Sequence, residues 1–446
     1  MTHALPDLAQ QLLDAAKAAG ADAADTLVTE GFQTSVDVRD AKLEEAQRAE
    51  GVDFGLRVII GTRQAVVSSM DARPDTIRAM AERAVAMARE APEDPSVGLA
   101  DPSLLATEVP DLDLADDAGD PSPDVLRDMA LAAEAAARGV DGITKTDSAG
   151  AGASRRHIHL AGTNGLSAGY ERTSRSLSVV AIAGTGTAME RDWAFDGRTH
   201  LSDLDPPEEI GRLAAERTLA RRAPRRPRTG TYPVLYDERV AAGLIGHLVA
   251  AINGMMIARG SSWAKDLMGA SVLPDGLSLT ERPLRPRVTG SRPLDAEGLA
   301  TREAPLVEDG VLGRWVLDLS TARRLGLKST GNAARGTSTP PSPSVTNLHL
   351  TAGTANRDDL IAQMGTGLLV TSLIGSTINP NTGDYSRGAS GIWYEKGAPV
   401  HAVSEVTIAG NLRDMLRTIV PANDARSYAS HVVPSLLVPS MTIAGE

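Results

Sequence analysis

The fold class is decided by the stretch RHIHLAGTNGLSAGYERTSRSLSVVAIA, residues 156–183. It contains three strand-type runs, Arg156–Ala161, Gly165–Thr173 and Ser176–Ala183, in which polar and apolar or β-branched residues alternate. Short turn-forming segments separate these runs, so the strands should follow one another directly in the chain. The stretch therefore predicts consecutive antiparallel strands within a longer strand-rich segment, residues 143–191.

Helices are predicted in separate blocks outside this stretch, where apolar residues recur at helical spacing. They are expected at Leu5–Ala19, Thr76–Glu90, Pro123–Arg138, Pro207–Arg221 and Val240–Met255. Buried strands are expected again at Gly367–Ile378 and Ser390–Val406. Long strand series with segregated helices predict an α+β protein with antiparallel sheets, an N-terminal α/β module and a strand-rich C-terminal domain.

The chain length of 446 residues suggests more than one domain. We expect an N-terminal module at residues 1–92, a middle region at 93–223 and a C-terminal domain at 229–446. Pro92–Pro123 is acidic and rich in proline, so it is predicted to be an exposed connection. The basic stretch Arg221–Arg228 could be a phosphate or partner patch, but its short length and lack of aromatic residues favour a proline-stiffened linker.

The composition excludes several functional classes. A formal charge of −12 disfavours nonspecific nucleic-acid binding. The chain has no cysteine, so it can form neither disulfides nor thiolate zinc sites. We find neither a signal-peptide pattern nor an uninterrupted apolar stretch of about 18 residues. The expectation is a cytoplasmic protein that binds neither membrane nor nucleic acid.

Histidines give two weak candidate sites. His157 and His159 are two residues apart on a predicted strand, so their side chains should share one face. A third ligand on that face could complete a metal site, but a polar strand face is the commoner explanation. His401 is the only sequence-local base for Ser390 in a seryl triad. These residues leave open an independent hydrolase. No His-Glu pair occurs in the chain, which excludes a zincin site on a single helix.

Several segments resemble the TldD/PmbA family, whose older label is a proposed modulator of DNA gyrase. Gly51–Val58 resembles the N-terminal module of these proteins, and Gly162–Gly165 resembles their middle region. Thr330–Ala333 and, most specifically, Asn379–Gly391 resemble the C-terminal region. Ile408–Leu412 follows as it does in the TldE (PmbA) type. The resemblance covers nearly the whole chain.

This resemblance implies a heteromeric zinc metalloprotease. Its TldD-type subunit carries a His-Glu-x-x-x-His helix, in which Glu is the general base and the two His, with a Cys, bind zinc. The matching helix here is Val240–Met255, and the motif falls on Gly246, His247 and Ala251. Glycine and alanine cannot bind zinc, and histidine cannot replace the carboxylate base. The resemblance thus implies a non-catalytic subunit that binds no cofactor itself and whose TldD-like partner holds the zinc.

Peptides or unfolded polypeptides are the substrates that the family implies, and the chain alone could form a homodimer. Five residues are predicted to contact a peptide, added as a strand, or a partner. They are Asn379, Asn381, Asp384, Ser386 and Gly388. An equally weighted alternative is an Asx-type turn between two strands. A regulatory binding protein of the gyrase-modulator type is the remaining alternative.

Overall fold

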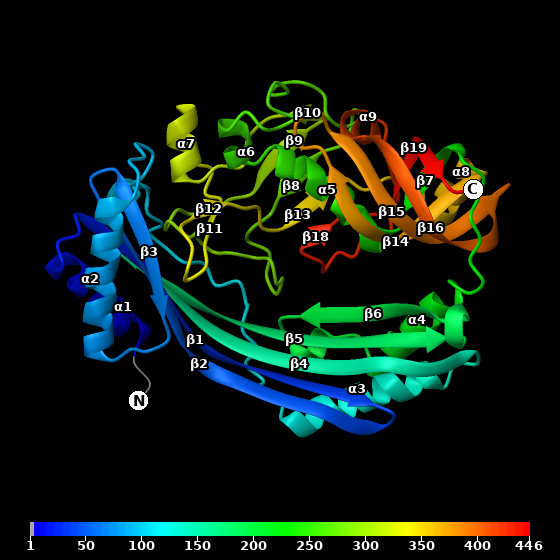
Figure 1. Cartoon of the computed structure of the whole chain (residues 1–446), viewed down its shortest axis with the longest axis horizontal. Coiled ribbons are helices and arrows are strands. Elements are labelled where there is room, and N and C mark those ends of the chain that lie inside the picture. The colour runs from blue at the N-terminus through cyan, green and yellow to red at the C-terminus, as the bar shows by residue number, and fades with distance from the viewer. Residues whose placement is uncertain (1–3) are drawn as a thin grey trace.

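The structure is a computed structural model that describes residues 4–446, apart from the side chain of Ser376. A long curved sheet and its helices form one half of the molecule, and the C-terminal half lies along it (Figure 1). Strands and helices occur in separate blocks, so the predicted α+β class is confirmed.

The first sheet has the strand order β3-β2-β1-β4-β5-β6, and every pairing in it is antiparallel. Its strands are β1 (Ala23–Arg39), β2 (Lys42–Ile60), β3 (Arg63–Ser69), β4 (Ile143–Gly162), β5 (Ser167–Ala183) and β6 (Glu190–Arg198). The predicted turn between Thr173 and Ser176 is wrong, because β5 runs through it without interruption. Arg175 is fully buried there, and its Nη2 donates to Asp120 Oδ1 at 2.9 Å. This ion pair allows a charged residue inside a central strand.

Four helices cover one face of this sheet. They are α1 (Leu5–Ala18), α2 (Pro74–Glu90), α3 (Pro123–Arg138) and α4 (Pro207–Leu219). On β1, Val28 packs in the core beneath α1 and α2, and Val36 packs beneath α3 and α4. Both residues have even numbers, so all four helices share a face. The opposite face, which carries Leu27 and Leu160, packs against Leu294 of the C-terminal half.

The C-terminal half is built around a sheet that closes on itself. The strands β7 (Gly230–Tyr236), β14 (Gly367–Ile378), β15 (Asp384–Glu395), β16 (Ala398–Asn411) and β19 (Leu436–Ala444) form it, with the short β17 (Val420–Pro421) beside β19. Closure results because β16 pairs with both β15 and β19. The predicted strand Ser390–Val406 is therefore a hairpin formed by β15 and β16. Only β7 and β14 run parallel in this sheet.

Smaller elements complete this half. A second sheet contains β8 (Leu279–Glu281), β9 (Ala304–Glu308), β10 (Val311–Leu312), β13 (Leu348–Leu350) and β18 (His431–Val432), and β11 (Ala333–Ala334) pairs with β12 (Ser342–Pro343). The helices are α5 (Glu238–Ala251), α6 (Gly254–Ala258), α7 (Leu319–Leu325), α8 (Arg357–Met364) and α9 (Leu412–Arg417). None of the helices within residues 4–446 is long and apolar enough to cross a membrane.

The two irregular segments singled out by composition differ in their contacts. Leu112 and Leu114 of Pro92–Pro123 are buried, so this connection is only partly exposed. The basic stretch Arg221–Arg228 contains no regular element, and Arg226 forms an ion pair with Glu405. Its position and this pairing favour the linker interpretation.

Candidate functional site

The helix onto which the family resemblance places the zinc motif is shorter than predicted. The expected helix Val240–Met255 ends at Ala251, and a new helix, α6, begins at Gly254. The side chain of Asn253 causes the break, because its Oδ1 caps α6 by accepting a hydrogen bond from the Met255 amide at 3.0 Å. All three motif positions lie on α5.

Gly246 and Ala251 lie in different environments. A Cβ atom built on Gly246 would have no neighbouring atom within 4 Å, so this side of α5 is open. Ala251 is only 6% exposed, and its carbonyl accepts a hydrogen bond from Ser262 Oγ at 2.5 Å. Neither side chain offers a lone pair to a metal ion.

His247 packs against the segment that carries the most specific family motif. Its ring meets that of Tyr385 edge to face, with centroids 5.7 Å apart and an interplanar angle of 73°. Its Nε2 atom is buried and has no hydrogen-bond partner among the described residues. Burial lowers the pKa of His247, and the nearby Arg387 guanidinium lowers it further. A neutral imidazole beside a fixed positive charge is a poor base and a poor cation site. Tyr385 and Arg387 were not predicted, because no sequence signal links β15 to α5.

The residues Asn379–Asp384 form a self-contained turn between β14 and β15. Asn379 Oδ1 accepts hydrogen bonds from the amides of Asn381 at 3.0 Å and Thr382 at 3.4 Å. Asp384 accepts from Thr382 Oγ1 at 2.6 Å and from Asn411 Nδ2 at 3.1 Å. This geometry is that of the alternative Asx-type turn.

Ser386 and Gly388 lie within β15, which is paired on both sides. Ser386 faces Thr377 on β14 and Ala409 on β16. A peptide strand added at these positions would have to displace a neighbour, so any contact there would involve side chains. The role of Asn379, Asn381, Asp384, Ser386 and Gly388 in binding stays a prediction.

Within residues 4–446, His157, His159 and His401 do not meet the ligand or seryl partners predicted for them. The His157 side chain is 47% exposed, whereas His159 is buried with its Nε2 3.3 Å from Ser167 Oγ. His401 Nδ1 lies 2.8 Å from the Ala402 carbonyl, and across the hairpin its pairing partner is Trp393 rather than Ser390. In residues 4–446, no three His, Cys, Asp or Glu side chains are grouped to hold a metal ion.

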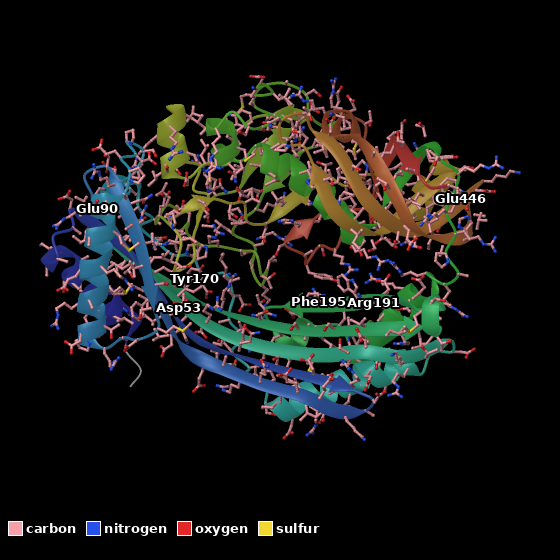
Figure 2. The ribbon with its side chains drawn as sticks, viewed as in Figure 1. Asp53, Glu90, Tyr170, Arg191, Phe195 and Glu446 are labelled. Atoms are coloured by element: carbon pink, nitrogen blue, oxygen red, sulfur yellow. The ribbon has the colours of Figure 1, made fainter. Side chains whose placement is uncertain are left out.

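A cavity of about 770 Å³ lies between the helix-free face of the first sheet and loops of the C-terminal half. Asp53 and Tyr170 mark its sheet side, below β11 and β12 (Figure 2). Behind it, Asp25 forms buried ion pairs with Arg57 and Arg335. No sequence pattern predicts this cavity, because its walls come from segments far apart in the chain.

Models of known protein families match most of the chain. Residues 24–88, 116–222 and 229–445 match domain 1, the central domain and the C-terminal domain described for PmbA/TldA metallopeptidases. This chain belongs to the PmbA/TldD family. The sequence resemblance is thereby confirmed.

Relatives in the PmbA/TldD family are similar over almost their whole length. The metalloprotease PmbA of Escherichia coli O157:H7 is 38% identical, over 95% of this chain and 93% of the relative. The PmbA homologue of Haemophilus influenzae is 34% identical, over 97% of this chain and 94% of the relative.

Solved structures share the fold. A proposed modulator of DNA gyrase from Bacteroides thetaiotaomicron superposes with a TM-score of 0.91 at 27% identity, covering 99% of this chain and 98% of that chain. TldE from Thermococcus kodakarensis gives a TM-score of 0.86 at 21% identity, covering 98% and 100%. At that identity, the TldE structure supports the fold alone.

Proposed function

We propose that this chain is the non-catalytic subunit of a two-subunit metalloprotease of the PmbA/TldD family. A TldD-like partner would supply the zinc and the general base, and the complex would act on peptides or unfolded polypeptides. The observation that carries the proposal is the helix α5, where the motif positions hold Gly246, His247 and Ala251.

The chemistry of α5 supports this assignment. A catalytic zinc ion needs three protein ligands and an open position, and its water is commonly activated by a carboxylate. Gly246 and Ala251 have no ligating atoms, and the chain contains no cysteine to act as a further ligand. His247 is a single imidazole whose pKa is lowered by burial and by Arg387. These residues fit a helix that has no part in metal chemistry.

The open side of α5 supports a role in assembly. Gly243 and Gly246 lie three residues apart, and a Cβ atom on either would have no neighbour within 4 Å. Two such glycines give a helix surface onto which another backbone can approach closely. We propose that this surface, defined by Gly243 and Gly246, faces the TldD-like subunit or the wall of the substrate chamber. The absence of cysteine suits a cytoplasmic location for this complex.

The proposal is tested by purifying the chain alone and together with a TldD-like protein from the same genome. The lone chain should contain no stoichiometric zinc by mass spectrometry and should not cleave unfolded casein. The co-expressed pair should elute as one complex that contains zinc and loses activity with a chelator. Zinc-dependent cleavage by the lone chain would refute the proposal. Cleavage that is lost in His401→Ala would instead support an independent hydrolase, and recovery of gyrase without a TldD-like chain would support a regulatory protein.

The proposed interface on α5 is tested separately by a substitution at Gly246. Gly246→Arg should abolish co-purification with the TldD-like chain, because a long charged side chain would project from the open surface. Ala135→Arg places the same side chain on an exposed position of α3 and should leave the complex intact. An intact complex with Gly246→Arg would show that this side of α5 is not the interface.

A further inference from the structure

The cavity beneath β11 has an unusual concentration of arginine. Arg156 and Arg172 are paired neighbours on β4 and β5, and both line the cavity from the sheet. Arg292 and Arg335 line it from the C-terminal half. Four arginines therefore line one half-open cavity, together with four carboxylates, in a chain whose overall formal charge is −12.

Three of these arginines have no carboxylate partner. Within the part of the chain that the structure describes, Arg156, Arg172 and Arg292 form no ion pair. Arg172 Nη2 instead donates to the carbonyls of Thr289 at 2.8 Å and Ser291 at 3.1 Å. Arg292 Nη1 donates to the Ala333 carbonyl at 2.9 Å. These neutral acceptors hold Arg172 and Arg292 in place without cancelling their charge. Arg292 also acts on the carboxyl group of Asp295: burial raises the pKa of Asp295 to about 6, and the charge of Arg292 opposes this rise.

The charges affect one another. Burial lowers the pKa of Arg172, and the positive charges of Arg292 and Arg156 lower it further. Such mutual repulsion is relieved when an anion binds between the groups. Binding of an anion between these guanidinium groups is therefore electrostatically favourable.

Arg335 adds a second, independent observation. Its side chain is only 1% exposed, and Nη1 donates to Asp25 Oδ1 at 2.5 Å. Its Nε and Nη2 atoms are buried and have no hydrogen-bond partner among the described residues. Buried donors without acceptors are costly, so they indicate a partner that is missing from the chain itself. Because one carboxylate, Asp25, serves both Arg57 and Arg335, this triad also retains a net positive charge.

Three of the four carboxylates that line the cavity already have partners. Asp295 accepts hydrogen bonds from the backbone amides of Glu297, Leu299 and Ala333. Asp53 Oδ2 accepts from Thr337 Oγ1 at 2.7 Å. Glu50 forms an ion pair with Arg48. Glu30 lies opposite Val52 on β2 and His157 on β4, and its side chain forms no hydrogen bond or ion pair among the described residues. Neither Glu30 nor Glu50 forms an ion pair with the cavity arginines in residues 4–446.

An apolar wall adjoins the arginines. Leu160 and Leu294 are buried in one cluster, and Ile158 and Tyr170 pack against it. All four side chains line the cavity. A ligand that fits would combine an anionic group with an apolar portion, and a volume of about 770 Å³ is enough for a few residues of peptide.

We propose that this cavity binds a carboxylate of a peptide, with Arg156, Arg172, Arg292 and Arg335 as donors and an adjacent apolar side chain against Leu160 and Leu294. Guanidinium groups suit the carboxylate because they can donate two parallel hydrogen bonds to it. The inference rests on the proposed function in that it names the substrate feature that this subunit recognises. Its test needs only the lone chain, so it can fail or succeed independently of partner binding and proteolysis.

The experiment is calorimetric titration of the full chain with acetylated pentapeptides at low and high salt. The probes are AAALV as the free acid, AAALV as the C-terminal amide, AADLV as the amide, and inorganic phosphate. The best variant is Arg156→Gln, because the Arg156 side chain makes no hydrogen bond or ion pair in residues 4–446 and its loss should not affect folding. Arg212→Gln removes an equal charge from an exposed position on α4 and serves as the control.

The free acid should bind at least about tenfold more tightly than the neutral amide, and more weakly at high salt. Arg156→Gln should weaken this binding about tenfold, whereas Arg212→Gln should change it by less than about twofold. If only the free acid binds tightly, the cavity recognises a terminal carboxylate. If the aspartate-containing amide binds as tightly as the free acid, the cavity recognises an acidic side chain as well. Either result supports the site. Equal binding of the acid and the neutral amide, no effect of Arg156→Gln, or preference for phosphate would overturn it.

Discussion

Replacing Glu297 with glutamine should remove a pH dependence of stability that arises from burial. Glu297 is 5% exposed, and its Oε2 accepts a hydrogen bond from the Leu319 amide at 2.8 Å. Burial, helped by the nearby carboxylates of Asp295 and Asp318, raises the pKa of Glu297 from 4.5 to about 8. At neutral pH the folded chain therefore holds this side chain in its protonated form, which glutamine imitates in shape and hydrogen bonding.

The sign of the effect follows from the raised pKa. The folded chain binds one proton more than the unfolded chain between pH 4.5 and about 8. The stability from this proton is fully present below pH 4.5 and is lost as the pH rises through 8. Linkage gives a slope of about 1.4 kcal/mol per pH unit for one proton, or roughly 2–3 kcal/mol between about pH 6 and about pH 8. Burial also raises the pKa of Asp295, to about 6, so its contribution ends near the lower limit of this window.

The assay is urea unfolding at several pH values between about 6 and 9, followed by tryptophan fluorescence. Trp263 and Trp315 lie in the core of the C-terminal half and report on this region. The wild-type midpoint should fall as the pH rises, whereas the Glu297→Gln midpoint should change much less. Glu308→Gln, at an exposed position on β9, should follow the wild type. Parallel profiles for wild type and Glu297→Gln would refute the buried-proton argument.

Three further predictions concern stability. Gly246→Ala should raise the free energy of unfolding by about 0.5–1 kcal/mol in thermal melts, because the site is open and alanine favours helix. Gly211→Ala should lower the free energy of unfolding, because the new Cβ atom would lie 2.1 Å from the Ala133 carbonyl oxygen. Asp25→Asn should cost about 3–5 kcal/mol in urea unfolding, because it leaves two buried guanidinium groups without an ion-pair partner; a loss below about 1 kcal/mol would contradict the triad. Ser122→Ala should cost about 1 kcal/mol, because its Oγ caps α3; an unchanged melting temperature would show that the cap is dispensable.

The sequence alone was sufficient for features that depend on neighbouring residues. The helix Pro123–Arg138 was predicted with the bounds that α3 has, because helix periodicity is a local property. The α+β class and the family followed from strand runs and from Asn379–Gly391 for the same reason. At the positions to which the resemblance assigns the zinc motif, residue identity was also sufficient, since the side chains of Gly246 and Ala251 cannot ligate zinc.

Only the tertiary structure decided the features that depend on distant segments meeting. Ser174 and Arg175 looked like a turn, but pairing with β4 and β6 and a buried ion pair make them part of one strand. The contact between His247 and Tyr385 results from packing of α5 against β15, which lies more than a hundred residues later in the chain. The arginine-lined cavity arises where the first sheet meets loops of the C-terminal half, and the raised pKa of Glu297 arises from its burial near Asp318. Burial and charge proximity are properties of the folded arrangement, and no local pattern in the sequence encodes them.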